Sequence, residues 1–86
     1  MPEISRFLGI IIAMYFKDHN PAHFHVKYNN HRAVIAINGL SVIEGSLPPR
    51  VWGLVMEWAV LHKGELLENW DLLHKGPEFN RIAPLA

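Results

Sequence analysis

The stretch "HFHVKYNNHRAVIAINGLSV", residues 23–42, decides the fold, because two turn signals divide it into runs of strand-forming residues. The pairs Asn-Asn at 29–30 and Asn-Gly at 38–39 tolerate the positive φ angles of a two-residue hairpin turn. Two such turns in succession predict an antiparallel meander. Its strands are expected at about 23–28, 31–37 and 40–44.

The same turns determine which side chains share a face of the sheet, because side chains alternate along each strand. Tyr28 is expected opposite His31 across the first turn, and Ile35 opposite Val42 across the second. One face carries the apolar set that a helix should cover: Phe24, Val26, Tyr28, Ala33, Ile35, Ile37, Leu40 and Val42. The other face carries a more polar set: His23, His25, Lys27, Arg32, Val34, Ala36, Ser41 and Ile43. The histidines of this second set are therefore expected to lie outside the core.

Residues 10–16 are rich in β-forming side chains and predict a strand before the meander, with a short further strand at about 4–8. The strand at 10–16 is apolar on both of its faces, and residues 51–61 are nearly all apolar as well. A two-layer domain of this size cannot easily bury both sides of every element. The apolar side chains that the domain cannot bury predict a partner surface, formed with a second copy or with a small protein encoded nearby. Burial under the C-terminal tail is the alternative.

The second half of the chain is expected to be helical over residues 49–75. Pro49 suits the first position of a helix, and mostly apolar side chains recur at three- and four-residue steps through residues 51–73. The period continues past Gly64, so one long helix and a pair of helices remain equally open. A Gly-Pro pair ends the pattern, and residues 77–86 are expected to form an extended tail.

One domain over residues 1–86 accounts for this order of elements, since 86 residues, 50% of them hydrophobic, can bury a single core. The strands occupy about residues 4–45, and the helical region follows them. We predict an α+β fold, with an antiparallel meander sheet of four or five strands. A C-terminal helix or helix pair is expected to pack on one face of this sheet.

The composition excludes several kinds of site. The chain has no cysteine, so it forms no disulfide and offers no thiolate to a metal. Its formal net charge is +0, and any attraction for nucleic acid must therefore be local. No run of residues approaches the roughly 20 apolar positions that span a bilayer. We expect a cytoplasmic protein without membrane contact.

The motif "DHNPAHFH", residues 18–25, places three of the chain's 6 histidines beside an aspartate. His23 and His25 are two residues apart on one strand, roughly 6.5–7 Å between Cα atoms, while Asp18 and His19 lie in the loop before it. Imidazole and carboxylate groups at this spacing can ligate zinc or nickel, so these four residues are candidate metal ligands. Without a metal, two imidazoles can act as acid and base near neutral pH. A third interpretation is that the histidines only pack the loop and bond its backbone.

Lys27 and Arg32 are expected to be cross-strand neighbours on the same face as the histidines. Two cations in this position can hold a phosphate group, and a solvated sheet face is the alternative. Together with His23 and His25 they are the candidate catalytic residues of a metal-independent ribonuclease, in which the histidines transfer protons and the cations stabilise negative charge.

Four segments of the chain resemble a prokaryotic family of small proteins, the domain of unknown function forty-one sixty: "PEISRF", "MYFKDHNPAHFHVKY", "VIEGSLPPR" and "EWAVLHKGELLENW". The resemblance covers almost the whole chain, but it implies no activity that can be carried over. Members of that family are often encoded beside another small protein in the manner of toxin–antitoxin pairs. We therefore predict a component of such a gene pair, which binds RNA or phosphate through the His/Lys/Arg face of the sheet and could cleave RNA there. A histidine-based metal-binding module and a non-catalytic protein-binding partner are the alternatives.

Overall fold

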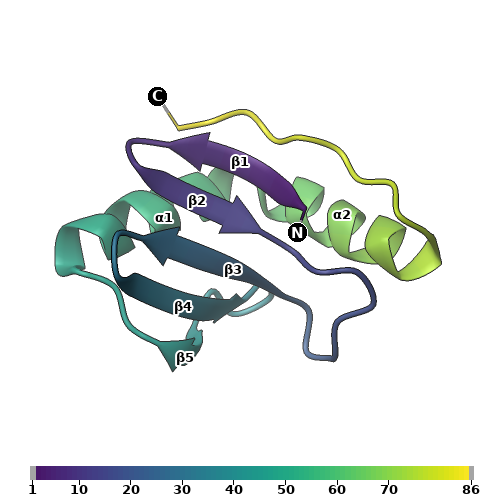
Figure 1. Cartoon of the computed structure of the whole chain (residues 1–86), viewed down its shortest axis with the longest axis horizontal. Coiled ribbons are helices and arrows are strands. Elements are labelled where there is room, and N and C mark those ends of the chain that lie inside the picture. Colours follow the sequence, from purple (N-terminus) through teal and green to yellow (C-terminus); the bar gives the residue numbers. More distant parts are fainter. Residues whose placement is uncertain (1, 86) are drawn as a thin grey trace.

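The computed structural model describes residues 2–85, which form one antiparallel sheet with two helices behind it (Figure 1). The sheet has the order β1-β2-β3-β4-β5, so that each strand pairs with the next one along the chain. The strands are β1 (Glu3–Phe7), β2 (Ile10–Ala13), β3 (His23–Tyr28), β4 (His31–Ala36) and β5 (Val42–Gly45). The helices α1 (Pro49–Leu61) and α2 (Lys63–Lys75) follow. The predicted α+β meander with C-terminal helices on one face is confirmed.

Residues in left-handed backbone conformation make the first two hairpin turns. Leu8 and Gly9, with φ of 51° and 80°, turn β1 into β2, as expected for a two-residue hairpin. Asn29, with φ of 51°, turns β3 into β4. The pairs across this second turn are those predicted: Tyr28 with His31, Val26 with Ala33, and Phe24 with Ile35.

The turn between β4 and β5 is longer than the predicted two-residue turn at 38–39. Leu40 takes the left-handed conformation there, with φ of 50°. Ile35 still pairs with Val42, as predicted, but the register shifts immediately after this pair. The prediction that Val42 belongs to the core is wrong. Val42 lies on the edge strand β5 and keeps 44% of its surface exposed.

The helices cover the face of the sheet that carries Phe24, Val26 and Ile35, and together they form the core. Trp58 of α1 is fully buried at its centre, with its ring 5.5 Å from the Phe7 ring and 6.2 Å from the Phe24 ring. The register derived from the two asparagine turns thus assigned the buried face correctly.

Two helices form rather than one, and the break lies at His62 instead of Gly64. His62 has φ of −121° and ψ of 21°, while Gly64 lies inside α2. Only one residue separates the two helices, which explains why the apolar period of the sequence continues from α1 into α2. No helix within residues 2–85 has the length and apolar character that a membrane crossing requires.

Residues 76–85 form an extended tail that runs beside β1 (Figure 1), and residue 86 of the predicted tail lies outside the described residues. The N–H group of Ile82 donates to the carbonyl oxygen of Ile4 at 2.8 Å, and Nε1 of Trp58 donates to the carbonyl oxygen of Ala83 at 2.8 Å. Ile82 is buried in this contact. The tail therefore covers the β1 edge of the sheet. It also buries some of the apolar side chains for which the sequence predicted a partner surface. Large apolar side chains that remain exposed include Val42, Ile43, Val60 and Leu61.

Candidate functional site on the open face of the sheet

The loop of residues 14–22, which joins β2 to β3, carries the first part of the site. The strand predicted at 10–16 ends earlier, at Ala13. Helix α2 holds the loop, because Nε2 of His74 lies 2.8 Å from the carbonyl oxygen of Asp18. The N–H group of Lys17 also donates to the carbonyl oxygen of Leu73, at 3.4 Å. These contacts bring the carboxyl group of Asp18 over the start of β3.

Asp18, His23 and His25 form a compact group, which we call the Asp18 cluster. Oδ2 of Asp18 lies 2.8 Å from Nε2 of His23 and 3.2 Å from Nε2 of His25. One side-chain atom from each of the three residues lies within 4.8 Å of the others. The second ring nitrogen of His23, Nδ1, lies 2.7 Å from the carbonyl oxygen of Pro21. The two imidazoles therefore converge on one carboxylate oxygen.

The carboxyl group of Asp18 is ionised more readily than an ordinary aspartate. Its partial burial raises the pKa, but hydrogen bonds from the His25 ring, the backbone N–H of His19 and the His23 ring lower the pKa of Asp18 by a larger amount together. A carboxylate with this many donors is an anionic centre. It suits either a protonated imidazole or a cation.

His23 is buried, with 8% of its surface exposed, so the expectation that it lies outside the core is wrong. The residue does start β3 on the predicted face, but the loop of residues 14–22 and α2 close around its ring. The ring of Trp70 lies 5.1 Å from the ring of His23.

His19 does not join the other three predicted metal ligands. Its side chain is exposed, and only its backbone N–H takes part, by donating to Oδ1 of Asp18 at 2.9 Å. Of the four candidate ligands, the structure therefore brings together Asp18, His23 and His25.

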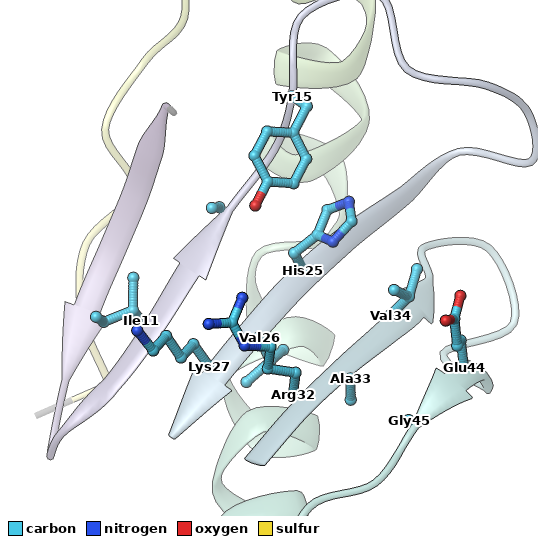
Figure 2. A pocket seen from close by; sticks show the side chains of 11 residues that line it. Ile11, Tyr15, His25, Val26, Lys27, Arg32, Ala33, Val34, Glu44 and Gly45 are labelled. Carbon is cyan, nitrogen blue, oxygen red and sulfur yellow. The ribbon is translucent and has the colours of Figure 1, made fainter. Parts of the chain in front are cut away.

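A pocket of about 340 Å³ opens on the face of the sheet opposite the helices, which we call the open face (Figure 2). Its lining includes one histidine, His25, and three formally charged residues, Lys27, Arg32 and Glu44. Lys27 pairs with Arg32 across β3 and β4, as predicted. Three of the four predicted catalytic residues thus line one pocket, while His23 lies in the Asp18 cluster.

The pocket also has an apolar part, made by Ile11, Ala13 and Val34. In the sheet, Ile11 pairs with Lys27 and Ala13 pairs with His25, so apolar and polar side chains lie side by side across the strands. Tyr15 stands at one end of the pocket, with its ring 4.3 Å from the His25 ring in an edge-on contact (Figure 2).

Sequence reasoning missed Tyr15, Glu44 and His74 as residues of the site. Tyr15 follows Ile11 and Ala13 in alternation, and this period was the available signal for its place on the open face. Glu44 reaches the pocket through the register shift in β5, and His74 through the fold of α2 against the loop. Neither of these two long-range contacts has a local sequence signal.

Comparison with known proteins gives one result for the family. A family model described as "Domain of unknown function (DUF4160)" matches residues 9–71. This range includes the Asp18 cluster and every residue that lines the open-face pocket. No curated protein and no solved structure matches the chain.

Proposed function

The chain belongs to this family of unknown function, and from the geometry of its open face we propose that it binds single-stranded RNA in the open-face pocket. The proposal rests on one observation. Lys27, Arg32 and His25 line the same pocket, and part of that pocket is apolar. The chain as a whole has a formal net charge of +0. The attraction for phosphate is therefore local to this face, and it does not extend over the protein.

The two cations suit a phosphate group in different ways. Arg32 offers a planar set of N–H donors that can bind two phosphate oxygens at once, while Lys27 supplies a compact positive charge. Figure 2 shows both side chains over the middle of the sheet, between β2 and β4. A phosphate held there would lie close to the His25 side chain, which lines the same pocket.

The rest of the pocket suits a nucleotide better than a free phosphate ion. Its volume of about 340 Å³ is in the range of small-molecule sites, and Tyr15 adds an aromatic ring of the kind on which bases stack. Glu44 supplies a hydrogen-bond acceptor for an amino group of a base or for a ribose hydroxyl. A single strand, with its bases unpaired, can place one nucleotide in this space.

The same arrangement supports RNA cleavage with a single histidine in the pocket. His25 would accept the proton of the 2′-hydroxyl, and Asp18 orients its ring through the bond to Nε2. Arg32 and Lys27 would stabilise the charge of the phosphorane, and the leaving 5′ oxygen would take its proton from solvent. His23 would not transfer protons to RNA in this scheme, because it is buried against Trp70 and its Nε2 faces Asp18. Its part would be to hold the carboxylate.

Binding and cleavage are tested separately with a labelled oligoribonucleotide of mixed sequence. Fluorescence anisotropy at low salt should show binding by the wild type and a loss of at least about tenfold for Arg32→Ala, with a slope of affinity against salt reduced by about one. Arg50→Ala is the matched control, because Arg50 is an exposed arginine on α1 in the other layer. Equal affinity of Arg32→Ala and Arg50→Ala would contradict the proposal.

Cleavage is measured in chelator, with the wild type beside His25→Ala. A loss of about 10²–10⁴-fold in rate is expected if His25 is the base. Equal background from both proteins would end the nuclease part of the proposal and leave RNA binding in place. We also propose a cytoplasmic location, where a protein that acts on cellular RNA would meet it.

A protein partner is a second candidate, favoured by apolar side chains on the open edge of the sheet. Val42 and Ile43 of β5 are 44% and 47% exposed, and the tail covers only the opposite edge. A second copy, or the other product of a toxin–antitoxin-like gene pair, would bury these side chains. Sedimentation at micromolar concentration should then show a dimer or a co-purified complex. A monomer that stays monomeric when the neighbouring gene is co-expressed would contradict this candidate.

A further inference from the structure

We propose that the Asp18 cluster is a binding site for one divalent transition-metal ion, with zinc as the best fit. The proposal rests on the contacts of Asp18, His23 and His25 alone. It does not depend on RNA binding in the neighbouring pocket, and the two proposals can fail separately.

The three potential ligand atoms are already near the positions that a zinc ion requires. Bonds of about 2.0–2.1 Å in a tetrahedral site hold the ligand atoms roughly 3.3 Å apart. Oδ2 of Asp18 lies 2.8 Å and 3.2 Å from the two Nε2 atoms, and all three atoms lie within 4.8 Å of one another. An ion would therefore need the Asp18–His23 contact to open by about half an ångström and the two nitrogens to move closer to each other, while the Asp18–His25 contact already has about the required length.

The orientation of His23 is the one that metal-binding histidines commonly have. Its Nδ1–H donates to the carbonyl oxygen of Pro21 at 2.7 Å. This bond leaves Nε2 as the ring nitrogen that faces Oδ2 of Asp18, at 2.8 Å. A metal ion would take the place of the Nε2 hydrogen in this contact, and the proton would go to solvent. The ring is also packed between Trp70 at 5.1 Å and His25 at 5.2 Å, so its orientation is restricted by packing as well as by the hydrogen bond.

Asp18 is held by contacts that leave one oxygen available to an ion. Its Oδ1 accepts the backbone N–H of His19 at 2.9 Å, and its carbonyl oxygen lies 2.8 Å from Nε2 of His74. Oδ2 is the atom shared by both imidazoles. The supporting bonds thus reach the ligand residues through atoms other than those that would bind the metal, as in natural metal sites.

The set of two imidazoles and one carboxylate selects the class of metal. Imidazole nitrogen suits zinc, nickel, cobalt and copper, whereas magnesium and calcium prefer sites made of oxygen alone. The chain has no cysteine that could complete a closed structural zinc site. Three protein ligands leave the fourth tetrahedral position for water or another ligand, which is the arrangement of reactive zinc sites. Since His25 belongs to both the cluster and the pocket, an ion bound here would lie at the edge of the pocket.

The test uses the full chain without a polyhistidine tag, stripped with a chelator and titrated with zinc in a calorimeter. We expect one ion per chain for the wild type and a loss of more than tenfold in affinity for Asp18→Asn, His23→Gln and His25→Gln. His19→Gln is the matched control, because it removes a histidine of the same loop that lies outside the cluster. It should bind zinc as the wild type does.

Two further readouts separate loss of the site from loss of the fold. Cobalt bound to the wild type should give the intense visible absorption of a tetrahedral site, and this band should be lost in His25→Gln. Zinc should raise the melting temperature of the wild type and of His19→Gln but not of His25→Gln, whose ring is only partly buried and whose folding is checked by circular dichroism. No binding by the wild type at 100-fold molar excess of zinc, or an equal loss in His19→Gln, would overturn the proposal.

Discussion

Nε2 of His74 lies 2.8 Å from the backbone carbonyl oxygen of Asp18, and this contact joins the last turns of α2 to the loop that carries the site. Nδ1 of the same ring lies 2.8 Å from the carbonyl oxygen of Trp70, one turn earlier in α2. Both ring nitrogens therefore face acceptors, one in each layer of the fold. The helix layer, which lies behind the sheet, positions a carboxylate that belongs to the open face.

We expect His74→Ala to loosen this loop without unfolding the domain. The substitution removes the ring contact to Asp18, which is worth about 0.5–1.5 kcal/mol of unfolding free energy. Urea unfolding should show a loss of that size. Relative to the wild type, amide hydrogen exchange should become faster in residues 15–22, while exchange in β3 and β4 should change little. His31→Ala is the control, because His31 is exposed at the start of β4. Faster exchange throughout the sheet, or no change in the loop, would contradict this role of His74.

Gly45 is expected to tolerate alanine poorly. It has a left-handed backbone, with φ of +81°, and a Cβ atom at this position would overlap the carbonyl oxygen of Arg32. Gly45→Ala should therefore lower the free energy of unfolding by about 2 kcal/mol or more. It should also weaken ligand binding in the pocket, because Gly45 and Arg32 both line it.

Gly64→Ala provides the matched contrast for Gly45→Ala. Gly64 lies inside α2, and a Cβ atom there would meet nothing within 4 Å. Alanine is the better helix former, so this substitution should raise the free energy of unfolding by about 0.5–1 kcal/mol. A Gly45→Ala variant as stable as the wild type would contradict the close approach of β5 to Arg32, and a destabilised Gly64→Ala variant would contradict the open surroundings of Gly64 in α2.

Acid should weaken the ion pairs that Glu3 forms with Arg6 and Arg81. The hydrogen bond from Arg6 lowers the pKa of Glu3, with desolvation opposing it and the positive charges of Arg6 and Arg81 adding to the lowering. A folded pKa below the unfolded value means that the contribution of Glu3 is fully present above the unfolded pKa, about 4.3. It is lost as the pH falls through the folded pKa.

Urea unfolding of the wild type and of Glu3→Gln between pH 3 and pH 6 measures this contribution. The wild type should lose more free energy of unfolding on acidification than Glu3→Gln does. Parallel pH profiles for the two proteins would show that the Glu3 contacts with Arg6 and Arg81 add no pH-dependent stability.

The sheet could be predicted from the sequence because its decisive signals are local. The turn at Asn29 and the alternation on either side of it were sufficient for the β3–β4 register and for the buried face. The break at His62 was not predictable, because the residue lies within a continuous apolar period. No glycine or proline stands at this position to indicate that the helix ends there. The exposure of Val42 depends on its place at the edge of the sheet, which the apolar pattern does not reveal.

The candidate site was predictable in the same partial way. The cross-strand pair Lys27 and Arg32, and the place of His25 beside them, follow from strand register. The burial of His23 and the exclusion of His19 depend on how the loop of residues 14–22 folds against α2. Contacts between segments so far apart in the sequence have no local signal, so the motif "DHNPAHFH" identified the region but not which of its side chains come together.

The central claim is that the open face of the sheet is the ligand surface, and the imidazole resonances of the chain test it most directly. Nuclear magnetic resonance can follow the ring Cε1–H signals of the 6 histidines while a short oligoribonucleotide is added at low salt. We expect the His25 signal to shift first and furthest, while the signals of His31 and His62 stay unchanged. A His25 signal that stays in place while His31 or His62 shifts, or an equal drift of all the rings, would contradict it.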